Sequence, residues 1–126
     1  MSRNIDRTGW QAYFDRVSRN LEGQQAELEV ASLGIGDQIA AEWVALGGIV
    51  YDPKDDLVEM VLGDLDHLIH QPREIWVDEE GLSLASLEVV DREGMRHILK
   101  LRAPLMLPAP EARTREDSRQ APRPSK

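Results

Sequence analysis

Hydrophobic positions recur at intervals of three and four residues near the start of the chain. Five large apolar side chains share this spacing: Trp10, Tyr13, Phe14, Val17 and Leu21. Such a spacing places side chains on one face of an α-helix. The pattern therefore predicts an amphipathic helix of about three turns, with Thr8 as its N-cap and Gly23 as its end.

After this helix the pattern changes to the alternation of apolar and polar residues that is typical of β-strands. Six segments show strand character: residues 26–30, 42–51, 57–62, 74–80, 84–90 and 95–101. Turn sequences separate them, including Gly34–Asp37, Asp52–Asp56 and Asp91–Gly94. The run 42–51 is almost continuously apolar, so we expect a strand covered on both faces, with a bulge or close backbone approach at Gly47 and Gly48.

Strands that follow one another at hairpin spacings indicate an antiparallel sheet. The sequence thus predicts an α+β fold, in which an N-terminal helix packs on a mostly antiparallel sheet of about six strands. The segment before Pro72 is read differently, as a short turn of helix through residues 67–69 that the proline ends.

The composition changes at Pro104, which divides the chain into a single α+β domain at residues 1–103 and a tail at residues 104–126. Five of the seven prolines lie in this tail, which has no glycine and no aromatic residue. Five basic and three acidic residues follow its last apolar cluster at 105–107. A segment of this composition buries too little apolar surface to become ordered, so we predict a disordered, Pro- and Arg-rich tail.

Several of these segments together resemble a bacterial family that is catalogued as domain of unknown function 5335. The features that match are Trp10, Phe14 and the stretches 48–52, 67–75 and 91–101. The resemblance covers residues 8–103 and leaves out the tail. It implies a small single-domain cytoplasmic protein, and it assigns no activity and no catalytic residue.

The charge of the chain excludes some classes of partner. Asp and Glu number 23 against 15 Lys and Arg, which gives a net charge of −8. Binding to nucleic acid through phosphates needs a basic surface, and so does adsorption to an anionic membrane. No apolar run has the length of a membrane helix, and the N-terminus lacks the apolar core of a signal peptide. We therefore expect a cytoplasmic protein that binds neither nucleic acid nor membrane.

The residues that usually carry catalysis are absent or poorly arranged. The chain has no cysteine, which excludes disulfides, thiolate catalysis and Cys-based metal sites. No serine lies in a Gly-x-Ser-x-Gly motif, and the glycine pairs match no phosphate-binding loop. We predict no catalytic residue, no cofactor and no metal site. A non-enzymatic role is favoured, and the sequence leaves open whether the protein is an enzyme.

Histidines are the remaining candidates for chemistry. On a helical turn, His67 and His70 would share a face and could approach one metal with Asp64 or Asp66, as in a metal-dependent hydrolase. Two histidines without a third nitrogen or sulfur ligand make an incomplete site, so we give this alternative less weight. His97 lies on the apolar face of its strand, which is typical of a hydrogen-bonded core residue. The sequence leaves open whether it contacts His67.

Two hypotheses about function involve aromatic residues. By alternation, Trp76 lies on a polar face with Glu74, Asp78 and Glu80, where an exposed tryptophan indicates an interface. We therefore favour a non-enzymatic interaction or regulatory module that binds an unidentified protein or a second copy of itself. The alternative is a small-ligand binding protein, whose pocket between helix and sheet is lined by Trp10, Tyr13, Trp43 and Tyr51.

Overall fold

The computed structural model describes residues 1–109, and the disorder predicted for the later part of the tail lies outside them. One α-helix, two short 3-10 helices and eight strands make up this part of the chain. Their bounds are β1 Ser2–Asn4, η1 Arg7–Gly9, α1 Trp10–Val17, η2 Ser18–Asn20, β2 Gln25–Ser32, β3 Gly36–Asp52, β4 Leu57–Leu62, β5 Leu65–His70, β6 Pro72–Glu80, β7 Ser83–Asp91 and β8 Arg96–Met106.

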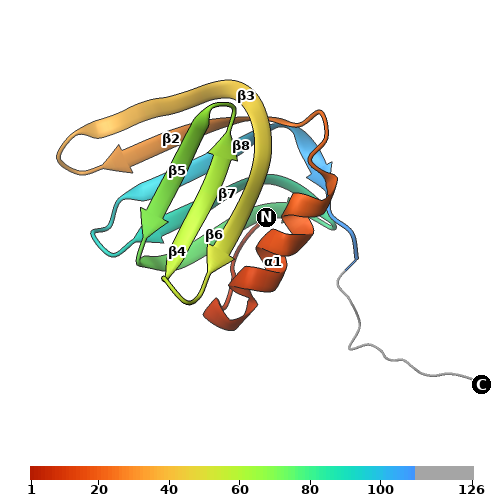
Figure 1. The fold of residues 1–126 in the computed structure, drawn as a ribbon, viewed down its shortest axis with the longest axis horizontal. Coiled ribbons are helices and arrows are strands. Elements are labelled where there is room, and N and C mark those ends of the chain that lie inside the picture. The colour runs from red at the N-terminus through yellow and green to blue at the C-terminus, as the bar shows by residue number, and fades with distance from the viewer. Residues whose placement is uncertain (110–126) are drawn as a thin grey trace, which may run out of the picture.

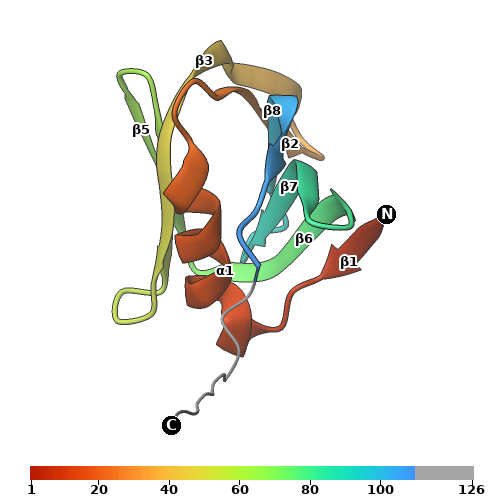
Figure 2. The same cartoon turned by 90° about the vertical axis from the view of Figure 1, so that its right-hand side faces the viewer.

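The eight strands form one antiparallel sheet in the order β1-β6-β7-β8-β2-β3-β4-β5. Strand β3 pairs with β2 through residues 36–45 and with β4 through residues 46–52. It therefore joins two arms, which we call the first arm (β1, β6, β7, β8, β2) and the second arm (β4, β5). Figure 2 shows the sheet folded over at β3, with α1 between the arms.

Two irregularities accompany the bend of β3. Trp43 has a φ of 51°, and the register with β2 shifts there. The register with β4 shifts between Leu46 and Gly48, and a Cβ atom on Gly47 would lie 3.2 Å from Val61 Cγ1. The predicted bulge at the glycines is thus confirmed. The expectation that the run 42–51 is covered on both faces is wrong, because Glu42, Ala45 and Val50 within it are exposed.

Helix α1 lies beside β3 (Figure 1) and between the two arms (Figure 2), as its apolar stripe predicts. All five residues of the stripe are buried, although the helical segment divides into η1, α1 and η2. The first turn is capped by Asp6 and not by Thr8, since the Asp6 carboxylate accepts the Thr8 backbone N–H at 3.2 Å. The Tyr13 hydroxyl donates to the Glu79 carboxylate on β6. No helix in residues 1–109 is long and apolar enough to span a membrane.

The sheet has eight strands, where the sequence predicted about six. Three residues at the N-terminus form β1, which pairs with β6. The segment predicted as a turn of helix is the edge strand β5, paired with β4. The reason lies in the alternation of Leu65, His67 and Ile69, which places these three side chains on the inner face of the second arm.

The last strand extends past the predicted domain boundary at Pro104. Strand β8 ends at Met106, and both Leu105 and Leu107 are buried. Leu105 pairs with Leu84, and the register is irregular between Leu84 and Ser86. A proline is tolerated at such an irregularity, because no ladder hydrogen bond requires its missing N–H. The ordered domain therefore includes the apolar cluster 105–107.

Candidate functional site

Trp76 lies on the outer face of the first arm, where alternation placed it. Its side chain is 39% exposed, and its indole N–H donates to the Glu74 carboxylate at 3.0 Å. Cross-strand pairs connect it in sequence to one residue on each of the four neighbouring strands β7, β8, β2 and β3. We call this set the outer-face row: Trp76, Glu88, Ile98, Glu29 and Ile39.

Apolar and acidic side chains alternate along the outer-face row, and bases from β8 neutralise the acids. Arg96 binds both oxygens of the Glu88 carboxylate, at 2.8 and 3.1 Å. Lys100 Nζ lies 3.8 Å from a carboxylate oxygen of Glu29. The row ends at Ile39, which is 52% exposed. It is thus a mixed apolar and charged surface on the side of the sheet opposite the core.

The aromatic residues of the ligand hypothesis do not surround a common pocket. Trp10, Tyr13 and Tyr51 are buried in the core, and the rings of Trp10 and Tyr51 meet edge to face at 5.1 Å. Trp43 is half-buried at the bend of β3, with the Arg102 guanidinium 5.8 Å from its ring. Trp10, Tyr13 and Tyr51 fill space between helix and sheet, and core packing explains them.

His67 and His70 lie on opposite faces of β5. A spacing of three residues brings side chains together on a helix but separates them on a strand. His67 points into the molecule with Ile69, whereas His70 is exposed beside Leu57. In residues 1–109, no group of three or more His, Cys, Asp or Glu is arranged to hold a metal ion. The geometry thus gives no support to the hydrolase alternative.

A different histidine pair joins the two arms. His67 Nε2 on β5 lies 2.9 Å from His97 Nδ1 on β8, and His97 Nε2 lies 3.0 Å from an Asp91 carboxylate oxygen. The other Asp91 oxygen accepts the backbone N–H groups of Glu93 and Met95. We call Asp91, His97 and His67 the histidine chain.

The partners determine the direction of the hydrogen bonds. An ionised carboxylate only accepts, so His97 Nε2 donates to Asp91. Nδ1 of a neutral His97 is then an acceptor, and His67 Nε2 donates to it. His67 Nδ1 remains as a proton acceptor at the end of the chain. Asp91 was predicted only as a turn residue. A signal that could have indicated this site is the alternation of Leu65, His67 and Ile69, which places His67 on the same face as two apolar residues.

Burial and neighbouring groups shift the titration of the histidine chain. Burial lowers the pKa of His67 below its usual 6.5, and the nearby His97 lowers it further. Burial alone would raise the pKa of Asp91. The hydrogen bonds from His97, Met95 and Glu93 outweigh burial, so the pKa of Asp91 lies below its usual value.

Acid is therefore expected to weaken the fold through His67. The unfolded chain binds a proton at His67 more readily than the folded protein does, so the free energy of unfolding falls as the pH drops below 6.5. His67→Gln keeps a donor toward His97 and removes the titration. The free energy of unfolding, measured in urea, should therefore change less between about pH 7.5 and about pH 5.5 in this variant than in the wild type. His70→Gln is the control and should behave like the wild type, and equal slopes in all three proteins would contradict the assignment.

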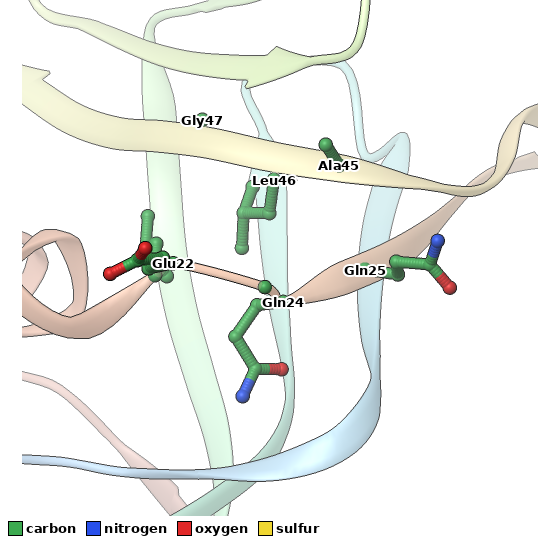
Figure 3. Close-up of a pocket in the computed structure, with 8 residues that line it drawn as sticks. Glu22, Gln24, Gln25, Ala45, Leu46 and Gly47 are labelled. Carbon is green, nitrogen blue, oxygen red and sulfur yellow. The ribbon is translucent and has the colours of Figure 1, made fainter.

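A cavity of about 390 Å³ lies where the loop before β2 meets β3. Figure 3 shows the polar ends of Glu22, Gln24 and Gln25 pointing in three different directions. The Gln24 side-chain oxygen is buried, and within residues 1–109 it has no hydrogen-bond partner. Because these polar groups do not converge, they do not form a ligand site.

Comparison with known proteins establishes the family. A model described as a family of unknown function, DUF5335, matches residues 1–110. The chain belongs to this family. An "Uncharacterized protein" from Aquifex aeolicus (strain VF5) is 43% identical over 108 residues, which cover 85% of this chain and 97% of the relative. No solved structure matches.

Proposed function

We propose that this protein is a non-enzymatic interaction module, and that its outer-face row binds another protein chain. The observation that carries the proposal is the alignment of Trp76, Ile98 and Ile39 across the face opposite the core. Tryptophan is enriched among the residues that dominate binding energy at protein interfaces. A partner would cover this row and remove its apolar surface from water.

The charges of the row favour a protein partner. The acids Glu88 and Glu29 already have basic neighbours in Arg96 and Lys100. Arg96 therefore supplies a counter-charge for Glu88 when the row is covered, which reduces the main cost of docking on a charged surface. Glu29 lies near Lys100 and also near the Asp37 carboxylate. Both signs of charge lie on this face, so the face can be complementary to itself. A second copy of the chain, related by a two-fold axis, can therefore be the partner, and so can a different protein.

A second apolar surface on the other side of the bend provides a comparison. Val50, Glu59 and Leu68 pair across β3, β4 and β5, and the two apolar residues are 42% and 45% exposed. This surface crosses three strands and has no aromatic residue. We therefore expect it to contribute less to binding than the outer-face row.

Paired variants test which surface binds. Trp76→Ser with Ile39→Ser removes two apolar side chains of the row, and Val50→Ser with Leu68→Ser does the same on the comparison surface. The partner is either a protein recovered from the source cell or a second copy of the chain. We expect the first pair of substitutions to weaken binding to it by more than about tenfold, because each anchor contributes over 1 kcal/mol. Native mass spectrometry and affinity capture with the full chain measure both cases. Identical complexes with all three proteins would refute the proposal.

A further inference from the structure

Four segments that are distant in the sequence meet at a hollow of about 240 Å³. They are η1, the turn between β3 and β4, the junction of β5 with β6, and the turn between β7 and β8. We call this the arginine hollow, and its lining residues are Arg7, Asp56, Gln71, Pro72, Arg73 and Arg92.

The arginine hollow is basic, although the chain as a whole has 23 acidic against 15 basic residues. It has three guanidinium groups and one carboxylate. The carboxylate belongs to Asp56, which pairs with Arg7 at 3.0 Å and accepts the Tyr51 hydroxyl at 2.8 Å. Within residues 1–109, Arg73 and Arg92 form no ion pair. In this part of the chain, neither of these two guanidinium groups therefore has a carboxylate within ion-pair distance.

Arg7 is held in place before any ligand arrives. Its guanidinium donates to the Tyr51 hydroxyl at 3.1 Å, to Asp56 at 3.0 Å and to the Pro72 carbonyl at 2.8 Å. The same group stacks 4.3 Å from the centre of the Trp10 ring. An arginine has five N–H donors, so two of them remain for a ligand. Fixed donors bind more tightly because little side-chain entropy is lost on binding.

The backbone at the junction of β5 and β6 is strained. Gln71 has a φ of 54°, a conformation that costs a non-glycine residue free energy. Its N–H donates to the Asp56 carbonyl at 2.9 Å, and its side-chain oxygen accepts from Arg92 at 2.9 Å. The next irregularity follows at once, because the register with β7 shifts between Pro72 and Glu74. These features bring Arg92 and Arg73 to the same hollow.

We infer that the arginine hollow binds the phosphate group of a small phosphate monoester. Guanidinium groups bind phosphate through pairs of charged hydrogen bonds. The hollow is smaller than the roughly 300–1,000 Å³ of pockets that enclose a whole drug-sized ligand. By itself the hollow therefore fits the anionic group of a ligand and not the whole ligand.

A neighbouring cavity accommodates the organic part of this ligand. It has a volume of about 370 Å³ and shares Gln71 and Arg92 with the arginine hollow. Ile69 and Met95 contribute apolar surface to its wall, and its polar lining includes His97 of the histidine chain and the acids Asp91 and Glu93. A monoester with a small apolar substituent would thus extend from the arginines toward the histidine chain.

Titration of the full chain with inorganic phosphate and with phenyl phosphate tests the inference. Calorimetry gives the affinities at constant ionic strength, and the backbone amide signal of Gln71 reports the place of binding. We expect saturable binding of both probes, tighter for phenyl phosphate, with a shift of the Gln71 signal. Arg92→Gln and Arg73→Gln should each weaken binding at least about tenfold.

Arg102→Gln is the matched control, because it removes the same charge from an arginine that contacts Gln25 at the other end of β8. Its affinity for both probes should equal that of the wild type. Equal losses in all three variants would mean non-specific attraction of anions and would overturn the inference. Absence of saturable phosphate binding would do so too, and phenyl phosphate binding no tighter than phosphate would overturn the ligand class. Thermal melting checks that the exposed substitutions leave the fold intact.

Discussion

Replacing Phe14 with alanine is expected to lower the free energy of unfolding by about 3–5 kcal/mol. Phe14 is fully buried on α1, at 0% exposure, between the two arms of the sheet. Its removal leaves a cavity that the two arms, joined through β3, cannot easily close. A loss of this size is a large part of the roughly 5–15 kcal/mol that stabilises a typical domain. Urea unfolding followed by circular dichroism measures it.

Gln11→Ala is the control for this prediction, since Gln11 is exposed on the same helix. Alanine favours a helix at an exposed site, so we expect a change within about 0.5 kcal/mol. A loss for Phe14→Ala as small as that of the control would contradict the placement of α1 in the core.

His97→Leu is expected to lower the free energy of unfolding by about 2–3 kcal/mol, although leucine suits a buried position. His97 is 5% exposed and bonds to both His67 and Asp91. The substitution leaves the donor of His67 and one oxygen of Asp91 without a partner. Leaving buried polar groups without a hydrogen-bond partner destabilises the fold by more than the burial of an apolar leucine stabilises it.

His70→Leu makes the same chemical change on the exposed face of β5 and is the control for His97→Leu. We expect its unfolding midpoint in urea to stay close to that of the wild type. If His97→Leu were as stable as the wild type, the histidine chain would contribute nothing to the attachment of the two arms.

The parts of the fold that the sequence predicted well depend on local periodicity. The stripe of α1 is an example, because the spacing of Trp10, Phe14 and Val17 determines the buried face without reference to the rest of the chain. The turn at Asp91–Gly94 is another, and the exposure of Trp76 follows from simple alternation.

The sequence-based predictions were wrong where contacts between distant segments determine the structure. His67 was read as part of a helical turn because a polar residue at an inward strand position has no local explanation. Its partner His97 lies 30 residues away and meets it only because the sheet folds over at β3. The arginine hollow gave no local signal either, since Arg7, Arg73 and Arg92 come from three separate segments. Similarly, the extension of β8 past Pro104 depends on pairing with β7.

Site-specific photo-crosslinking tests most directly whether the outer-face row is a binding surface. A photoreactive amino acid replaces Ile39 in one variant and Leu68, on the comparison surface of the second arm, in the other. Both positions are similarly exposed, at 52% and 45%. After irradiation in the source cell, we expect a defined adduct, with a second copy or with one other protein, from position 39 and not from position 68. Adducts from position 68 alone, or from neither position, would contradict the assignment of the outer-face row.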